Sequence, residues 1–252
     1  MIRNSIPSIF TVGNLFLGII AIILAFNSGT DNKNAELAAI FVIVAMLLDG
    51  LDGRVARALN AQSEFGKELD SLSDVISFGV APAFIMYVVA FQSMDASALA
   101  WIVTAIFPIC GALRLARFNV IAGTPGYFIG LPIPAAGSVL STLALFHNEI
   151  PSAILLASTL VLSFLMVSTV KYPNFKKVGI PKTAIWLTPI IVAGAVTLAI
   201  IYPGLLSKLI FIPLVIYALY GLNGLKKNAR RLFRRRKRRN SADEPTKSKT
   251  HG

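Results

Sequence analysis

The chain has 252 residues, of which 55% are hydrophobic and only 14% are charged, and its mean hydropathy is +0.70. This composition is typical of a membrane protein and argues against an ordinary soluble domain. Cys110 is the single cysteine, which excludes an internal disulfide, and with only His147 and His251 present the sequence argues against a histidine-based catalytic triad.

Apolar segments recur along the chain and predict an all-α, polytopic membrane helix bundle of about eight transmembrane helices. A helix needs about 20 apolar residues to cross the hydrocarbon layer. The first segment lacks a small-x-small cleavage site and further spans follow it, so we interpret it as a retained helix. The second is short unless its helix continues through the acidic residues that follow, which we expect. The expected spans are 8–26, 37–48 with its continuation, 68–91, 98–116, 135–146, 153–170, 184–201 and 205–220.

Two further features of the sequence do not fit the apolar pattern. Thr11 and Asn14 place polar side chains within the first helix, where a buried hydrogen bond between helices and a substrate contact are both open. The Gly- and Pro-rich residues 120–137 predict a loop, with a helix entry near Pro132.

The stretch 47–74 holds six of the twelve acidic residues and follows the pattern D-x2-D-G-x2-A-R-x8-G-x3-D-x3-D. On helices, Asp49 and Asp52 (i, i+3) share one face, and Asp70 and Asp74 (i, i+4) share another. The two carboxylate pairs can therefore point at one spot.

Carboxylates beside apolar segments are costly and mark a functional site by default. Within the stretch only Arg54, Arg57 and Lys67 are positive, and Glu64 and Glu68 add further negative charge. Hard divalent cations fill that deficit, and oxygen-only ligands favour Mg²⁺ or Mn²⁺ over zinc. A pair of such ions is the usual clamp for a phosphate or pyrophosphate.

The small residues of the pattern support this interpretation. Gly53, Ala56 and Gly66 remove bulk where a ligand comes close, and Arg57 offers a planar fork for phosphate oxygens. The alternative is helix-packing glycines, a snorkelling arginine and aspartates that merely face water. The combination at this spacing favours the site.

The formal charge of +12 is concentrated at the C-terminus. From Leu222 onward there are twelve Lys or Arg residues against two acids, a difference of ten. We therefore expect an integral membrane catalytic domain, 1–222, and a basic, disordered cytoplasmic tail, 223–252. An anchor or a patch for anionic headgroups is favoured over nucleic-acid binding, because the charge follows directly on a membrane segment.

The distribution of Lys and Arg also predicts the orientation. With eight spans, five basic segments fall on one side, whereas the opposite links carry only Lys33, with Lys208 just inside the last span. Both termini and the aspartates are therefore expected on the cytoplasmic side. The five basic segments are Arg3, the aspartate stretch, Arg114 with Arg117, the loop 171–182 and the tail.

The aspartate pattern resembles the signature of the CDP-alcohol phosphatidyltransferases, and every fixed position is matched. The resemblance implies a membrane enzyme that moves a phosphatidyl group from a CDP-linked lipid onto an alcohol and releases CMP. Other stretches, over roughly 6–182, are similar to the bacterial and archaeal phosphatidylserine synthases of this superfamily. They are "IPSIFTVGNLFLG", "SFGVAPA", "RLARFN", "GLPIPAAG" and "VKYPNFKK".

The resemblance also implies substrates and surroundings. CDP-diacylglycerol and L-serine would be the substrates, the location would be a prokaryotic cytoplasmic (inner) membrane, and a homodimer is expected. Asp49, Asp52 and Asp70 would hold two divalent ions, with Asp74 at or beside a metal and acting as the general base on the serine hydroxyl.

The remaining assignments concern substrate contacts. Gly53 and Ala56 would leave room for the cytidine and Arg57 would bind phosphate, and the other candidates for the CDP-lipid are Gly66, Asn14 and Thr11. By position alone, the candidates for the serine carboxylate are Arg114, Arg117 and Lys171, and their alternative role is as snorkelling residues that set the topology.

Two other functions remain open. The same chemistry with glycerol 3-phosphate or inositol phosphate as acceptor would need more basic contacts than serine does. A cation transporter using the aspartates would predict an inverted repeat, and the sequence has one aspartate cluster with no second copy.

Overall fold

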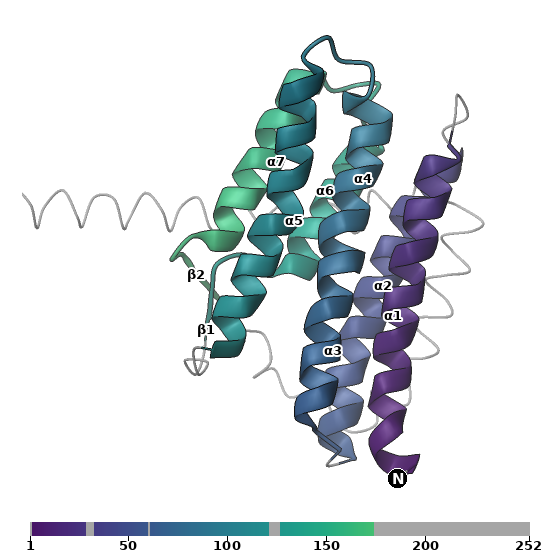
Figure 1. The fold of residues 1–252 in the computed structure, drawn as a ribbon, viewed down its shortest axis with the longest axis vertical. Helices are drawn as coiled ribbons and strands as arrows, with labels where there is room; N and C mark the ends of the chain where they lie inside the picture. The colour runs from purple at the N-terminus through teal and green to yellow at the C-terminus, as the bar shows by residue number, and fades with distance from the viewer. Residues whose placement is uncertain (1, 29–32, 60, 121–126, 174–252) are drawn as a thin grey trace, which may run out of the picture.

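The computed structural model describes residues 2–28, 33–59, 61–120 and 127–173 (Figure 1). The described residues are mostly helical. In chain order the elements are α1 (Ile2–Phe26), α2 (Lys33–Ala58), α3 (Glu64–Asp74), the π-helix η1 (Val75–Val80), α4 (Ala81–Met86), the π-helix η2 (Tyr87–Phe91), α5 (Ser97–Val120), β1 (Tyr127–Ile129), α6 (Ile133–Ala144), α7 (Ser152–Val167) and β2 (Lys171–Pro173).

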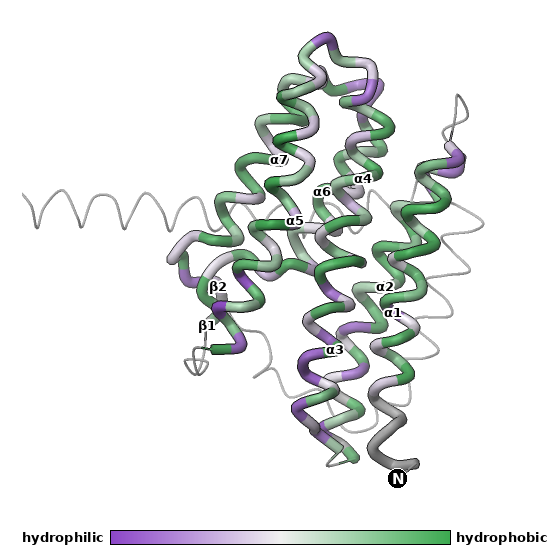
Figure 2. The backbone as a smooth tube through the Cα atoms, viewed as in Figure 1, coloured by the Kyte–Doolittle hydropathy of each residue, from purple (hydrophilic) through white to green (hydrophobic). Residues whose placement is uncertain are grey.

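Among the described residues, four helical segments are long and apolar enough to cross a membrane, and α6 and α7 are shorter apolar helices. Figure 2 shows apolar residues along most of their length, with hydrophilic residues gathered on α3. The polytopic helical membrane protein expected from the sequence is therefore confirmed. The expected spans 184–201 and 205–220 lie outside the described residues, so the count of eight stays a prediction. The four long segments are Ser8–Phe26, Lys33–Arg57, Glu64–Phe91 and Ser97–Val120.

The second helix continues through the aspartates as expected, since α2 runs from Lys33 to Ala58. The third begins at Glu64, four residues earlier than the sequence predicted. Ser63 is its N-cap: the backbone N–H of Gly66 donates to the Ser63 hydroxyl oxygen at 3.0 Å. This cap sets the start of α3 independently of the apolar pattern that begins further on.

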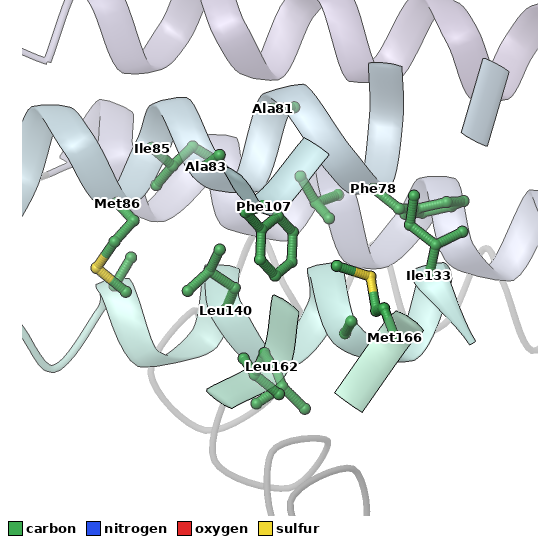
Figure 3. Close-up of a cluster of buried hydrophobic side chains, with 14 of the residues drawn as sticks. Phe78, Ala81, Ala83, Ile85, Met86, Phe107, Ile133, Leu140, Leu162 and Met166 are labelled. Atoms are coloured by element: carbon green, nitrogen blue, oxygen red, sulfur yellow. The ribbon is translucent and has the colours of Figure 1, made fainter. Parts of the chain in front are cut away.

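The long helices run alongside one another, with α1 packed against α2 and also against α3 and η1 (Figure 1). The main core lies farther along, where η1, α4, α5, α6 and α7 meet. Figure 3 shows Phe78, Phe107, Ile133 and Met166 in this core, and all four are buried. The apolar core thus lies next to the aspartate-bearing parts of α2 and α3, where the side chains are mainly polar.

A two-stranded antiparallel ribbon corrects the prediction of a plain loop over 120–137. Phe128 of β1 pairs with Tyr172 of β2, and Ile129 pairs with Lys171. Three-residue strands that pair across some 40 residues leave no periodicity in the sequence, because the pairing is non-local. Gly130 follows β1 at φ +79°, a conformation that favours glycine.

Replacing Gly137 by alanine is expected to destabilise the bundle. A Cβ at Gly137 would lie 2.9 Å from the Cα of Phe78 and would also meet the Phe78 carbonyl oxygen, so α6 and η1 would have to separate. Overpacking of this kind costs roughly 1–3 kcal/mol. Thermal unfolding of the purified protein in detergent would show a lowered Tm.

The matched control is Gly50→Ala, because a Cβ at Gly50 has nothing within 4 Å. Alanine is the better helix former by about 1 kcal/mol, so this variant should match or exceed the wild-type Tm. Equal Tm values for Gly137→Ala and the wild type would contradict the close approach of α6 to η1.

Candidate active site

Three aspartates from two helices converge at one end of the bundle. Asp49 belongs to α2, and Asp70 and Asp74 lie one turn apart on α3. Each offers a carboxylate oxygen, and these three atoms lie within 4.8 Å of one another. Asp74 is only 6% exposed, and the other two side chains are half-buried. The two carboxylate pairs expected from the sequence therefore meet at a single place.

Asp52 completes the cluster one turn along α2 from Asp49. It is 6% exposed, and the Thr11 hydroxyl of α1 donates a hydrogen bond to its Oδ2 at 3.0 Å. Asp52 and Asp70 lie within hydrogen-bonding range of each other, as do Asp49 and Asp70. Asp70 is thus the carboxylate that both aspartates of α2 approach.

Helix α1 is the scaffold on which the two aspartate-bearing helices are aligned. Besides the bond from Thr11 to Asp52, the Ser73 hydroxyl donates to the Thr11 carbonyl at 3.1 Å. One turn farther, the Ser77 hydroxyl donates to the Asn14 carbonyl at 2.9 Å. Sequence reasoning missed both serines, although their i, i+4 spacing places them on one face of the continuous helical segment formed by α3 and η1.

A cavity of about 470 Å³ opens beside the acidic cluster, a size within the range of small-molecule sites. Asp52 and Asp70 lie in its wall. Of the residues that the sequence assigned to the CDP-lipid, all but Asn14 line it. The lining residues are Ser8, Thr11, Asp52, Gly53, Ala56, Arg57, Ala61, Gln62, Ser63, Glu64, Gly66, Lys67 and Asp70.

Both charge signs are present at this cavity. Arg57 and Lys67 lie in the same wall as the carboxylates, and both side chains are exposed. Gly53, Ala56 and Gly66 present little or no side chain there, so the backbone itself forms part of the surface. A cationic and small-residue wall next to carboxylates is suited to a phosphorylated ligand that is bound together with cations.

Of the three basic residues assigned to the acceptor, the structure brings Arg114 to the aspartates. Arg114 is 6% exposed on α5 and lies within electrostatic range of Asp74. Its guanidinium carbon is 5.8 Å from the centroid of the Phe118 ring, within the range of a cation–π contact. Lys171 instead lies exposed on β2.

Arg117 is engaged by backbone carbonyls. Its Nη1 donates to the Val167 carbonyl at 2.9 Å, and its Nη2 lies 3.2 to 3.4 Å from the carbonyl oxygens of Ser168, Ile129 and Met166. These bonds join the end of α5 to the end of α7 and to β1. The sequence left a serine contact and a snorkelling role open for Arg117, and the structure shows a third arrangement, in which its guanidinium holds these segments together.

A hydrogen bond near the end of α5 was also missed by sequence reasoning. The Asn119 side-chain amide donates to the Ser71 hydroxyl at 2.9 Å, next to Asp70 on α3. Arg114 and Asn119 thus attach α5 to the aspartate-bearing helix at two levels. Asn119 belongs to the "RLARFN" stretch, and the sequence gave no sign of a partner 48 residues away.

The donor set fits divalent cations. Every side chain in the cluster offers oxygen and none offers nitrogen or sulfur. Arg114 is the basic side chain that acts electrostatically on Asp74, against two carboxylates that act in the opposite sense. Buried carboxylates in such excess need further positive charge, and Mg²⁺ or Mn²⁺ matches all-oxygen ligands.

Thr11→Val is expected to weaken substrate use while the fold persists. Valine keeps the shape of threonine and removes the donor to Asp52, which is then free to rotate away from Asp70. A hydrogen bond to a charged group contributes about 1.5–3 kcal/mol, so kcat/KM should fall roughly 10- to 100-fold. Steady-state kinetics with Thr11→Ser as the control checks this, because serine keeps the hydroxyl; equal losses in both variants would contradict the role of the bond.

Comparison with known proteins agrees with this geometry. The sequence profile of the CDP-alcohol phosphatidyltransferase family matches residues 4–170. The chain is 38% identical over 225 residues to the CDP-diacylglycerol–serine O-phosphatidyltransferase of Helicobacter pylori, covering 86% of this chain and 89% of that protein. It is 41% identical over 174 residues to the enzyme of the same name from Bacillus subtilis, covering 69% and 93%.

An archaeal relative extends the comparison. The archaetidylserine synthase of Methanothermobacter thermautotrophicus is 37% identical over 179 residues, which cover 69% of this chain and 72% of that protein. The family match spans the acidic cluster, the cavity wall and α5. This chain is a member of the CDP-alcohol phosphatidyltransferase family.

Proposed function

We propose that the chain transfers the phosphatidyl group of CDP-diacylglycerol to L-serine, giving phosphatidylserine and CMP. The observation that carries the proposal is the convergence of four aspartates from α2 and α3 beside a cavity with a cationic wall. The names of the bacterial relatives support serine as the acceptor. The chain is an integral membrane enzyme, which suits a reaction whose donor and product are both lipids.

Asp49, Asp52, Asp70 and Asp74 would hold two divalent ions, Mg²⁺ or Mn²⁺. When bound, such ions neutralise the pyrophosphate and stabilise the charge that develops as the bond to the leaving phosphate breaks. The residues around them bind and orient the donor. Arg57 and Lys67 are placed to pair with phosphate oxygens, and Gly53, Ala56 and Gly66 leave space for the cytidine.

Asp74 is the proposed general base. As the serine hydroxyl oxygen bonds to the lipid-bearing phosphorus, the hydroxyl proton passes to a carboxylate oxygen of Asp74. The bond from that phosphorus to the bridging oxygen breaks, and CMP leaves with the bonding electrons. Because Asp74 is buried at the inner side of the cluster, it is shielded from bulk water, which would otherwise compete with serine as the acceptor.

Arg114 is the strongest candidate for the serine carboxylate. It is buried and acts electrostatically on Asp74, so a serine whose carboxylate is held by Arg114 would present its hydroxyl toward the base. Lys171 remains a second candidate from β2. Arg117 has its guanidinium committed to carbonyl oxygens, and we assign it to holding α5 against α7.

The surroundings of the enzyme belong to the same proposal. The bacterial and archaeal relatives support a prokaryotic cytoplasmic membrane. The distribution of basic residues supports placing the aspartates and both termini on its cytoplasmic side. We also propose a homodimer, a catalytic domain over 1–222 and a tail over 223–252 that binds anionic headgroups.

The acceptor assay tests the proposed function. Purified enzyme in detergent with CDP-diacylglycerol and Mg²⁺ or Mn²⁺ would receive labelled serine, glycerol 3-phosphate or inositol phosphate in parallel. Serine-dependent release of CMP with formation of labelled phosphatidylserine is expected. Product from either phosphorylated acceptor, with none from serine, would keep the chemistry and overturn the acceptor.

A further inference from the structure

Asn14 stands apart from the other polar residues of the site. Its side chain is fully buried in α1, with 0% exposure. Neither its Nδ2 nor its Oδ1 has a hydrogen-bond partner within the described ranges. A buried amide without partners is costly, so its presence in this helix points to a further partner.

The hydrogen bonds around α1 place Asn14 at the level of two of the aspartates. Thr11, one turn earlier, bonds to Asp52, and α2 runs antiparallel to α1, so Asn14 lies opposite the turn of Asp49. The position of Gly13 agrees, since a Cβ there would lie 3.6 Å from Leu48. On the other side, the Asn14 carbonyl accepts from Ser77, which is three residues beyond Asp74.

The direction of the side chain follows from helix geometry. Thr11, Asn14 and Gly18 share one face of α1. Thr11 points at α2, and a Cβ at Gly18 would lie 2.7 Å from the Cα of Ser77 in η1. Asn14, between them, faces the space between α2 and α3, on the inner side of the carboxylates.

One buried donor and one buried acceptor therefore occupy the same level without partners. Nδ2 of Asn14 can donate, and Oδ1 of Asp74 can accept. We propose that Asn14 is a positioning residue for the reaction: its amide holds Oδ1 of Asp74, directly or through one bound water, and so orients the carboxylate that takes the serine proton. The proposal rests on the proposed function, and it removes Asn14 from the residues that contact the CDP-lipid, whose cavity it does not line.

The decisive variant is Asn14→Leu, because leucine nearly matches the branched shape of asparagine and has no polar atoms. The kcat for phosphatidylserine formation should fall about 10- to 100-fold, as expected when a hydrogen bond to a charged group is lost. KM for CDP-diacylglycerol should change less than about twofold, since Asn14 lies outside the cavity wall. The Tm should stay equal or rise, because an unsatisfied buried amide is replaced by an apolar group.

A purely structural amide would behave differently, since its loss would lower Tm and leave kcat per folded enzyme unchanged. Asn14→Val also removes the donor while keeping a branched side chain, so it should show the same loss of kcat. Asn14→Ser, which keeps a donor, should recover part of it. Recovery in the serine variant separates the hydrogen bond from packing.

The matched control is Ser141→Ala. The Ser141 hydroxyl is also fully buried and without a partner among the described residues, but it lies on α6, away from the cavity. Its removal should leave kcat within about twofold of wild type and keep or raise the Tm. A wild-type kcat in Asn14→Leu would overturn the proposal, whether KM for CDP-diacylglycerol is unchanged or raised. If the wild-type enzyme itself forms no phosphatidylserine, it is the proposed function that fails.

Discussion

Asp74→Asn is expected to abolish nearly all turnover while leaving CDP-diacylglycerol bound. An amide of the same shape cannot take the serine proton, and loss of a general base lowers kcat by about 10²- to 10⁴-fold. Asp74 does not line the cavity, whose wall stays intact in the variant. Equilibrium binding of labelled CDP-diacylglycerol and the rate of CMP release, measured on one preparation, would separate the two effects.

Asp95→Asn is the control for this substitution. Asp95 is exposed in the link between η2 and α5, remote from α2 and α3 in the chain, and the same change of charge there should leave both measurements at wild-type values. Turnover by Asp74→Asn at the wild-type rate would show that Asp74 is not the base.

Asp70→Asn is expected to remove binding and turnover together. Asp70 is the carboxylate within reach of both Asp49 and Asp52, and it also lines the cavity. Its neutralisation should therefore weaken both the cation site and the binding of CDP-diacylglycerol. The expected loss of transition-state stabilisation is about 3–5 kcal/mol, which corresponds to a fall in kcat/KM of roughly 10²- to 10⁴-fold. The measurement is the dependence of CMP release on Mg²⁺ concentration.

A shift of the half-saturating Mg²⁺ concentration is the result expected for Asp70→Asn. We expect Asp70→Asn to need several-fold more Mg²⁺ and to recover part of its rate when it is supplied, because the remaining carboxylates still form an incomplete site. Unchanged Mg²⁺ dependence and unchanged donor binding in this variant would remove Asp70 from the cation site.

The convergence of the aspartates was predictable because it depends on local rules. Spacings of three and four residues put Asp49 with Asp52 and Asp70 with Asp74 on single helix faces. The apolar run before Asp49 predicted the helix that carries the first pair. The charge deficit of the stretch then pointed to cations. The pairing within each helix uses residues one turn apart, where a sequence alone carries the geometry, and the charge of the whole stretch indicated that the two pairs meet.

The contacts between segments distant in the chain were not predictable in the same way. The bonds from Ser73 to Thr11 and from Asn119 to Ser71 join residues 62 and 48 positions apart, and β1 pairs with β2 in a stretch that the sequence indicated as loop. For Arg117 a basic residue at a helix end fitted both substrate binding and structure. Only the carbonyl oxygens gathered around it distinguish the two.

Counting the Mn²⁺ ions bound per chain by electron paramagnetic resonance tests the central claim most directly. That claim is that carboxylates from α2 and α3 together hold paired cations. The wild-type enzyme should bind two Mn²⁺, and both Asp49→Asn on α2 and Asp70→Asn on α3 should lose or weaken Mn²⁺ binding, whereas Asp95→Asn should not. Wild-type Mn²⁺ binding in both the Asp49 and the Asp70 variants would contradict a site shared by the two helices.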